Sequence, residues 1–453
     1  MASLEAPRRS YAEGHPAGSR YFLLLGLFLG FVGLLLLTVV DLRRGVLLPP
    51  SLYTKVGSPS AILYVHPVHL LMLFAALLGS AGVYRALIRE EGGALAAGVD
   101  LPRARNLTAG VLLAALVVDL FVYRSVQAAR IVHAGNLGVS FAFPVWSFPG
   151  WTRPVAEAVN YLLVVWHATA LGILIGGLLL VLLRMPGGAT GLERMLRARG
   201  LRAHVAGSLL ALPYPFCSCC AGPLGASLSR AGTGLDALLS FLVASPMLNL
   251  TTLVLATVLL PAPYALLRVL GGVVLAVFGA YLVLRALRAS GRVVVYRPSP
   301  WTDRLAGLLA LEHGLAEADA RTPATFVAAW LRTSWRLARA AIPVLFLAAI
   351  LTGALAPVIL SFAGRNDLPS TLKAAAAGTL LMIPTWTELA VARPLIQQGV
   401  TGPAAALLLT LPAVSLPSLA VVGMALGDYR PCALLAGMVF LAGVLAGVAF
   451  GGL

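Results

Sequence analysis

Charged side chains are scarce in this sequence, which has 11% charged and 59% hydrophobic residues along 453 positions. A soluble globular domain carries about twice that share of charge. The composition therefore excludes a soluble protein and predicts an integral membrane protein. The first long apolar run, residues 21–40, is not followed by a small-residue cleavage site. We expect it to stay as a membrane anchor rather than to be removed as a signal peptide.

Acidic residues are rarer than basic ones, which leaves a formal net charge of +16. A nucleic-acid-binding protein would carry such a charge, but here the arginines lie in short segments between apolar runs, where membrane topology accounts for them. We therefore expect no nucleic-acid partner. The chain also lacks a phosphate-binding glycine loop, a Walker motif and a catalytic triad, which excludes an ATP-driven pump built from this chain alone. We expect no enzymatic activity and no cofactor.

Cysteine is rare as well, with four in the chain, and Cys217, Cys219 and Cys220 stand close together. This clustering excludes a disulfide framework and suits soft-ligand or redox chemistry. Pro213 and Pro223 flank the cysteines, and a proline inside a helix removes a hydrogen bond. We therefore expect a broken helix. At membrane depth a broken helix faces protein or lines a cavity, which is typical of transport sites.

Nine apolar runs have about the 20 residues that a membrane-spanning helix requires. They are residues 21–40, 61–84, 107–123, 154–183, 235–260, 264–284, 342–362, 403–426 and 432–453. Two further runs, 201–229 and 371–398, are interrupted by prolines and polar residues, and we expect each to be a re-entrant hairpin. With the N-terminus inside, this arrangement places most of the 33 basic residues in cytoplasmic segments, as the positive-inside bias requires.

The predicted spans divide the chain into five parts. They are a cytoplasmic tail (1–20), an N-terminal three-helix membrane region (21–150), a first repeat with the CxCC hairpin (151–290), a cytoplasmic amphipathic linker (291–340) and a second repeat (341–453). The linker contains Trp301, Trp330 and Trp335 among arginines, a mixture that suits a helix lying on the membrane surface. A plain connection between two halves is the alternative.

The two interrupted runs match each other. The same spacing separates Pro213 from Pro223 and Pro384 from Pro394. Further matched positions are Gly232 with Gly399, Pro246 with Pro412, and Asn249 with Ser415. The arginine distribution has the first hairpin entering from the cytoplasm and the second from outside. The predicted fold is therefore an all-α polytopic membrane protein with an inverted-topology repeat. Chance alignment of prolines is the alternative.

In an inverted repeat the hairpin tips meet near the middle of the bilayer, with the positive ends of half-helices directed at the site. The proline register places Cys217 opposite Glu388, so one tip offers thiols and the other offers hydroxyls and a carboxylate. The candidate substrate-binding residues are Cys217, Ser218, Cys219, Cys220, Asn249, Thr387 and Ser415. The three cysteines are also candidate metal ligands, because thiolates suit Cu(I), Zn and thiophilic metalloids. Alternatively, they pack the hairpin as small apolar residues.

Ionisable residues inside apolar runs are candidates for coupling. Glu388 and Arg393 lie in the second hairpin, and a carboxylate there often carries protons. A structural ion pair between the two is the alternative. Asn249 and Ser415 could line the cavity or satisfy carbonyls freed by the prolines. Arg268 also lies within an apolar run.

A second group of ionisable residues lies in the N-terminal region. His66 and His69 share a helix face, and Asp119 in the next span could meet them. Such a group could bind a metal or relay protons, with interhelical hydrogen bonding as the alternative. His167 in the fourth span is a weaker candidate.

The run Pro215-Phe216-Cys217-Ser218-Cys219 resembles the PFCSC signature of the predicted permease family that includes the ArsP trivalent organoarsenical efflux permeases. Matching positions follow it at Pro223-Leu224, Ala226-Ser227-Leu228, Gly232, Ser245-Pro246 and Asn249, and a looser second motif ends in Ser415-Leu416-Pro417. The resemblance covers roughly residues 155–453. It implies a bacterial inner-membrane exporter without fixing arsenic as the cargo.

Three positions depart from the family pattern. Cys220 stands where the family commonly has glycine, Ser418 where an acidic residue is common, and Glu388 where a small or amide residue is usual. An acidic group has thus moved from one element to another, which bears on substrate and coupling ion.

The function predicted from these residues is secondary transport: a permease that exports a soft, thiol-reactive solute, with Glu388 coupling export to proton entry. One alternative is a membrane thiol oxidoreductase that uses the CxCC as its redox centre, and another is a channel of the same architecture. A carrier needs reduced thiols, whereas an oxidoreductase cycles Cys217 and Cys219 through a disulfide. The expected partners are the lipid bilayer and a small soft solute, and a homo-oligomer is left open.

Overall fold

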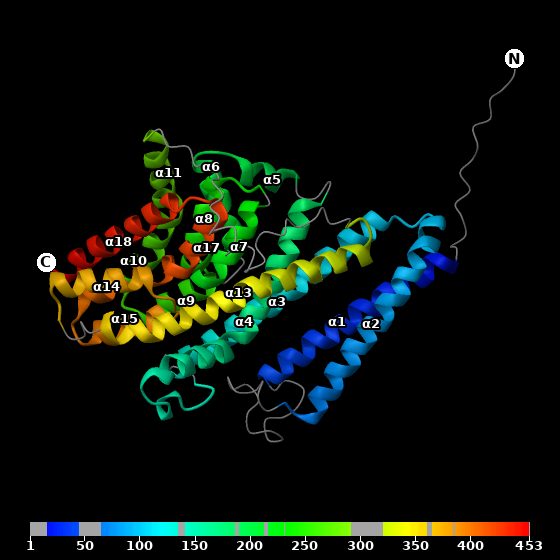
Figure 1. Cartoon of the computed structure of the whole chain (residues 1–453), viewed down its shortest axis with the longest axis horizontal. Coiled ribbons are helices and arrows are strands. Elements are labelled where there is room, and N and C mark those ends of the chain that lie inside the picture. The colour runs from blue at the N-terminus through cyan, green and yellow to red at the C-terminus, as the bar shows by residue number, and fades with distance from the viewer. Residues whose placement is uncertain are drawn as a thin grey trace, which may run out of the picture. The chain divides into compact units, whose positions relative to one another are not determined.

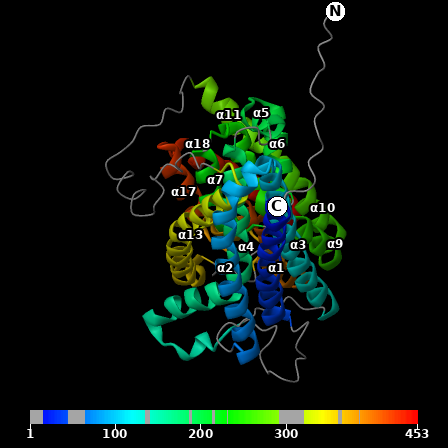
Figure 2. The same cartoon turned by 90° about the vertical axis from the view of Figure 1, so that its right-hand side faces the viewer.

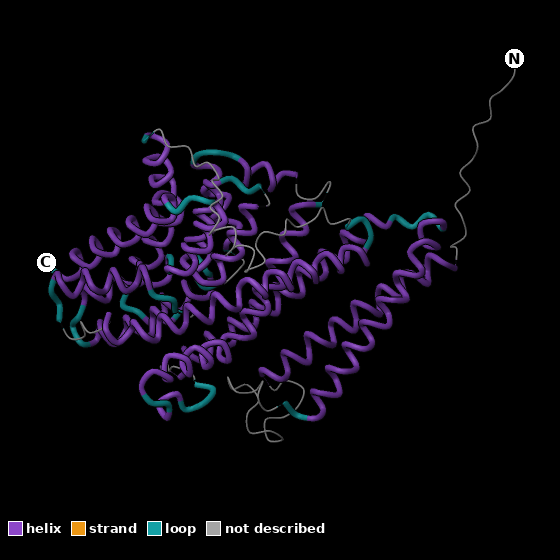
Figure 3. The backbone as a smooth tube through the Cα atoms, viewed as in Figure 1, coloured by secondary structure: helices purple, strands orange, loops and turns teal. Residues whose placement is uncertain are grey.

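The computed structural model describes residues 16–44, 65–134, 141–185, 190–212, 216–230, 232–290, 320–359, 365–383 and 386–452. Every regular element in these ranges is a helix (Figures 1 and 3). Eight of the described helices are long and apolar enough to cross a membrane, or nine if a bent pair is one span. The predicted all-α polytopic fold is therefore confirmed for the described part of the chain.

The described residues fall into two compact units. Unit 1 is drawn from Met1–Gly57, Tyr64–Leu112 and Asp319–Ala328, and unit 2 is drawn from the rest of the chain. In unit 1, helices α1 (Pro16–Arg44) and α2 (Pro67–Ala96) lie side by side (Figures 1 and 2). The structure thus places the first two predicted spans together as a helical hairpin.

Buried apolar residues hold unit 1 together. Tyr21, Leu87, Ala104 and Ala324 belong to one core cluster, which joins α1 and α2 to the starts of α3 (Leu101–Ala134) and α13 (Pro323–Ile359). In a bilayer, close packing of such side chains stabilises helix contacts through van der Waals interactions.

Unit 2 contains two series of helices. The first series comprises α4 (Arg153–Arg184), α5 (Thr190–Arg197), α6 (Leu201–Ala211), α7 (Ser218–Arg230), α8 (Leu235–Met247), α9 (Leu250–Leu259), α10 (Ala262–Val273), the π-helical turn η5 (Val274–Gly279) and α11 (Ala280–Ala289). Two 3₁₀ turns, η3 (Val145–Ser147) and η4 (Gly150–Thr152), precede it. The second series comprises α13, α14 (Leu368–Leu380), α15 (Thr387–Gln397), α16 (Thr401–Ala413), α17 (Leu416–Leu426) and α18 (Arg430–Gly451).

The two series follow the same plan. A long helix comes first, then the two short arms of an interrupted segment, then two helices joined at a bend, and finally a closing helix. Pro246 and Pro412 lie in the last turns of α8 and α16, just before the two bends. A proline removes a backbone donor and disrupts the helix around it, which explains why both segments break there.

Matched glycines separate the hairpin arms from the helices that follow. Gly232 between α7 and α8 has φ of 89°, and Gly399 between α15 and α16 has φ of 79°. Only glycine adopts this left-handed conformation at no steric cost. Two further glycines in the same register, Gly207 of α6 and Gly378 of α14, allow close helix packing, because a Cβ atom at either would clash with Ala237 or Thr410.

A matched hydrogen bond also occurs in both series. The backbone N–H of Gly200 donates to Asp236 Oδ1 at 2.9 Å, and the backbone N–H of Gly402 donates to Asn366 Oδ1 at 2.9 Å. In both series the bond joins residues just before the first arm to the first turn of the helix that follows the second arm. These observations agree with an internal repeat, while its inverted orientation in the membrane stays a prediction.

The start of α13 differs from the predicted domain boundary. The seventh span was expected to begin at residue 342, after a surface linker, but α13 already begins at Pro323 and its candidate span covers Pro323–Ala354. Three arginines interrupt the apolar run without breaking the helix, because residues spaced by three or four positions share one face. They are Arg332, Arg336 and Arg339. Residues 291–319, including Trp301, lie outside the described part of the chain.

Candidate functional site

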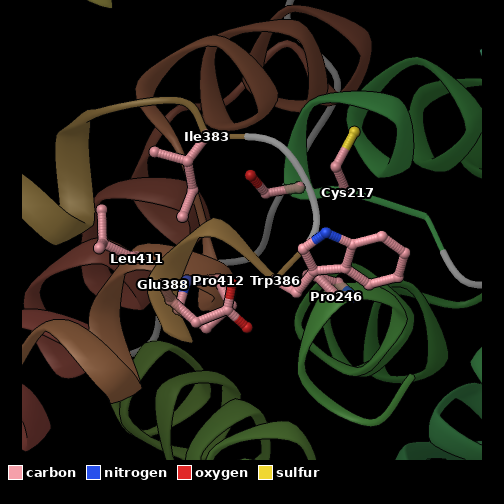
Figure 4. A pocket seen from close by; sticks show the side chains of 8 residues that line it. Cys217, Pro246, Ile383, Trp386, Glu388, Leu411 and Pro412 are labelled. Atoms are coloured by element: carbon pink, nitrogen blue, oxygen red, sulfur yellow. The ribbon is translucent and has the colours of Figure 1, made fainter. Parts of the chain in front are cut away.

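The two interrupted segments meet at one pocket. Its lining includes Cys217 and Ser218 from the first segment and Trp386 and Glu388 from the second (Figure 4). The remaining lining residues are Pro246, Ile383, Leu411 and Pro412. Both helix-breaking prolines therefore border the pocket. Cys217 and Glu388 line the same pocket, as the proline register predicts.

Cys217 lies at the N-terminus of α7, and its carbonyl accepts a hydrogen bond from the backbone N–H of Ala221 at 3.1 Å. The first N–H groups of a helix and its macrodipole stabilise negative charge at this end. Cys217 is also part of a buried apolar cluster with Ala158 of α4, Leu345 of α13 and Met382. The thiol thus combines a positive helix end with water-poor surroundings.

Trp386 occupies the equivalent place before α15. Among the described residues it is the non-glycine residue with positive φ, at 62° with ψ of 1°. Bulky residues adopt this left-handed conformation at an energetic cost, and such strained positions cluster at ligand clamps and active sites. The structure therefore points to Trp386 as a functional part of the second tip, although the sequence alone did not single it out.

Glu388 is buried and forms an ion pair with Arg268 of α10, with 3.1 Å between Oε1 and Arg268 Nη2. Arg268 is fully buried as well, and it donates to the carbonyl oxygens of Met247 at 2.7 Å and Pro246 at 3.3 Å. These carbonyls belong to the C-terminal end of α8, where no helical partner follows. The guanidinium of Arg268 thus donates hydrogen bonds both to the carbonyls at the bend of the first series and to the carboxylate of the second series.

The partner of Glu388 was not predicted correctly. From the sequence, the alternative to a coupling role was an ion pair between Glu388 and Arg393 of the same hairpin. The structure instead pairs Glu388 with Arg268. A signal was available, since Arg268 is an arginine within an otherwise apolar span, and ionisable residues at membrane depth are functional candidates by default. The pairing itself depends on residues far apart in the sequence.

Asn249 and Ser415 cap the helices that follow the two bends. The side-chain Oδ1 of Asn249 accepts a hydrogen bond from the backbone N–H of Thr251 at 3.0 Å. Ser415 forms a capping box with Ser418 at the start of α17. Neither residue is among those that line the pocket. The contacts show a different role from the two weighed from the sequence: both residues cap the start of the helix that follows the bend.

The remaining predicted ligands lie on the first turns of α7 and α15. Cys219 and Cys220 follow Ser218 on α7, where the structure describes the backbone but not these two side chains. Thr387 begins α15 next to Glu388. Among the described residues no group of three His, Cys, Asp or Glu side chains could hold a metal ion. The three-cysteine ligand set therefore stays a prediction.

The N-terminal candidates divide into separate pairs. His69 Nε2 lies 2.8 Å from Asp41 Oδ2 within unit 1, and Asp119 Oδ2 lies 3.4 Å from His167 Nε2 within unit 2. His66 caps α2, and its Nδ1 accepts a hydrogen bond from the backbone N–H of Val68 at 3.2 Å. The expected meeting of Asp119 with the two histidines is thus replaced by two Asp–His pairs, because the sequence did not reveal which helices pack together.

Comparisons with known proteins identify relatives of this chain. A family model described as "Predicted permease" matches residues 152–452. The UPF0718 protein YraQ of Escherichia coli is 32% identical over 301 residues, which cover 66% of this chain and 80% of that protein. The UPF0718 protein MJ0584 of Methanocaldococcus jannaschii is 26% identical over 300 residues, covering 54% of this chain and 81% of that protein. No solved structure matches the chain at a significant level.

Proposed function

Because this chain belongs to the predicted permease family, we propose that it is a secondary transporter that exports a soft, thiol-reactive solute. The membrane setting follows from the apolar helices and the family, and the solute class follows from the site. One observation carries the proposal: a cysteine thiol and a carboxylate, contributed by two different interrupted segments, line one pocket. In transporters built from repeats, such segments form the substrate site.

The thiol of Cys217 supports the proposed class of substrate. A sulfur ligand prefers soft metals and metalloids over hard cations such as Mg²⁺. For a trivalent organoarsenical bearing As–OH groups, each As–S bond that forms releases one water, since the thiol proton leaves with the hydroxyl group. Cys217 would take the first bond, and Cys219 and Cys220 stand near enough in the chain to take further ones. Hydrolysis reverses the exchange and frees the solute.

The ion pair between Glu388 and Arg268 supports a coupling of solute export to proton entry. Glu388 would take a proton from outside and release it inside, which couples solute export to proton entry. Protonation would weaken the attraction between Glu388 and Arg268 and leave the guanidinium held by the carbonyls of Met247 and Pro246. The bend between α8 and α9 and the second tip would then be free to move apart. Alternating access would follow from one series of helices rocking against the other.

The direction of transport rests on topology. The arginine distribution favours a cytoplasmic N-terminus, and the resemblance to exporters supports a bacterial inner membrane as the location. In this orientation the second interrupted segment enters from the outer side, so Glu388 meets protons from that side.

The decisive experiment measures flux of a thiophilic probe through the purified protein in liposomes. With phenylarsine oxide as the probe, Cys217→Ser should abolish protein-dependent flux, because a hydroxyl is too hard a donor for arsenic. Cys432→Ser is the matched control, since Cys432 is also buried but lies on α18 and does not line the pocket. It should transport as the parent does.

Two results would overturn the proposal. One is full flux in Cys217→Ser together with loss of flux in Cys432→Ser, which would place the site elsewhere. The other is the absence of flux in the parent while Cys217 and Cys219 cycle through a disulfide with an added oxidant and reductant, which would favour the oxidoreductase.

A further inference from the structure

Asp119 and His167 face each other inside the second unit without forming a hydrogen bond. Asp119 lies on α3 and His167 on α4, both within candidate spans, with 9% and 1% of the residue exposed. The closest approach is 3.4 Å, between Asp119 Oδ2 and His167 Nε2. Among the described residues, neither carboxylate oxygen and neither ring nitrogen has a hydrogen-bond partner.

The other buried Asp–His pairs that the structure describes are bonded differently. His69 and Asp41 are in hydrogen-bond contact at 2.8 Å. Asp236, near His204, accepts hydrogen bonds from the backbone of Gly200 and from Arg288. His204 Nδ1 in turn lies 2.7 Å from Ser240 Oγ. Those groups are held in fixed networks, which suits a structural role.

The surroundings of the Asp119–His167 pair are mostly aromatic. The ring of Tyr123, one turn along α3 from Asp119, stacks on the imidazole with 4.4 Å between ring centroids and 7° between planes. The ring of Trp166, the residue before His167, is tilted by 54° to the imidazole, with 5.3 Å between ring centroids. Tyr123 is the further titratable group that the described contacts place beside the pair, and no described arginine or lysine forms an ion pair with Asp119.

Such a pair is costly to bury. Polar groups taken out of water without hydrogen bonds lose the solvation free energy that water supplied, and charged groups lose more. Ionisable residues kept inside a membrane region despite this cost commonly serve as proton relays. Histidine is suited to the task because its ordinary titration range spans physiological pH. Unbonded nitrogens and oxygens also leave room for a proton to be shared between the two side chains.

His167 lies on the helix that packs against the first tip. Ala158 of α4 belongs to the same buried cluster as Cys217, and Gly172 lets Phe216 approach α4 closely. His167 is nine residues after Ala158, which in an α-helix is about half a turn away in direction. The front face of α4 therefore supports the first tip, and its rear face carries His167. A change in charge at the rear acts on the helix that backs Cys217.

We propose that Asp119 and His167 form a second proton-binding site, separate from Glu388, that loads and unloads one proton in each transport cycle. In the unloaded state the carboxylate is charged and the imidazole neutral; uptake of one proton makes the pair neutral overall. The transport part of this statement rests on the proposed function. Asp119 precedes the residues 152–452 that the family model matches, so the N-terminal region would add a coupling residue to the permease core.

Proton binding can be tested without any solute. The full-length protein, labelled with ¹⁵N-histidine and held in detergent, should give an imidazole signal that is absent from His167→Gln and that shifts between about pH 5 and pH 8. The midpoint of this shift should move in Asp119→Asn. His133→Gln removes an exposed imidazole of the same helix α3 and should leave that midpoint unchanged. A His167 signal that is constant over this range, or a midpoint that Asp119→Asn does not move, would overturn the proposal.

The role in transport needs vesicles with an imposed pH gradient and phenylarsine oxide as the probe. Asp119→Asn and His167→Gln keep the shape of the side chains, and both should lose the gradient-dependent part of export while retaining gradient-free exchange. His133→Gln should behave as the parent does. If both variants respond to the gradient as the parent does, the pair is not part of the cycle. If instead the parent moves no probe but the NMR shift is present, the proposed function fails and the proton site stands.

Discussion

Arg268 and Glu388 form a buried ion pair, with Arg268 Nη2 lying 3.1 Å from Glu388 Oε1, between two helices that are 120 positions apart in the chain. The same guanidinium holds the carbonyls at the end of α8. A single side chain therefore ties the bend of the first helix series to the carboxylate of the second. This contact is one that must change if the two series move relative to each other.

The ion pair should show strong coupling in a double-mutant cycle. Arg268→Gln leaves Glu388 buried without its counter-charge, and such a loss typically costs about 3–5 kcal/mol. Glu388→Gln should likewise lower the thermal unfolding midpoint in detergent. The double variant should lose less stability than the sum of the losses in the two single variants, because neither charge is left without its partner. Strictly additive losses would show that the contact contributes nothing to stability.

Glu388→Gln should also separate coupling from binding. The amide keeps the shape of the carboxylate but cannot take up and release a proton. We expect pH-gradient-driven export into inside-out vesicles to disappear, while solute binding and gradient-free exchange persist. The matched comparison is the same vesicles without a gradient, where parent and variant should agree. A variant that still responds to the gradient as the parent does would make Glu388 structural and leave Asp119 and His167 as the coupling groups.

The backbone at Trp386 predicts an unusual order of stabilities. A residue with a Cβ atom pays roughly 1–2 kcal/mol in the left-handed conformation, and glycine does not. Trp386→Gly should therefore be more stable than Trp386→Ala by about 1 kcal/mol, although both remove the indole from the pocket. Thermal unfolding of the two purified variants measures the difference. An alanine variant of equal or higher stability would mean that the tip relaxes once the indole is gone.

Membrane topology gives a further prediction. Arg194 and Arg304 should face the cytoplasm and Arg365 the outside, because this assignment places most basic residues inside. Single cysteines at these positions, in a background without the native four, can be labelled from either side of the membrane. Arg194 is exposed on α5, and Arg365 precedes α14. Arg304 lies outside the described residues. Labelling of positions 194 and 304 from opposite sides would mean that the first interrupted segment crosses the membrane.

The sequence predicts the fold well because the membrane imposes simple rules on helices. Run length alone located the spans, and the spacing of prolines placed Cys217 and Glu388 in register before any contact was known. The start of α13 was missed because three arginines on one helix face interrupt a hydropathy pattern without ending the helix. The partners of Glu388, His69 and Asp119 were missed for another reason. Each depends on which faces of distant helices pack together, and that information is not local.

The capping contacts reveal the same limit. Asn249 and Ser415 occupy matched positions, and the sequence suited them equally to lining a cavity or to satisfying carbonyls freed by the prolines. Both cap a helix that begins after a bend, where amide groups lack helical partners. The proline that breaks each helix thus creates the need for the polar residue that follows it.

The matched hydrogen bonds of the two series differ in one respect. In the first series Asp236, in the first turn of α8, accepts the bond from Gly200, which directly precedes α6. In the second series Asn366, which precedes α14, accepts the bond from Gly402 in the first turn of α16. Each bond therefore joins the chain just before the first arm of an interrupted segment to the chain just after its second arm. Each interrupted segment is closed at its base, so its two ends are fixed to each other whatever its tip contacts.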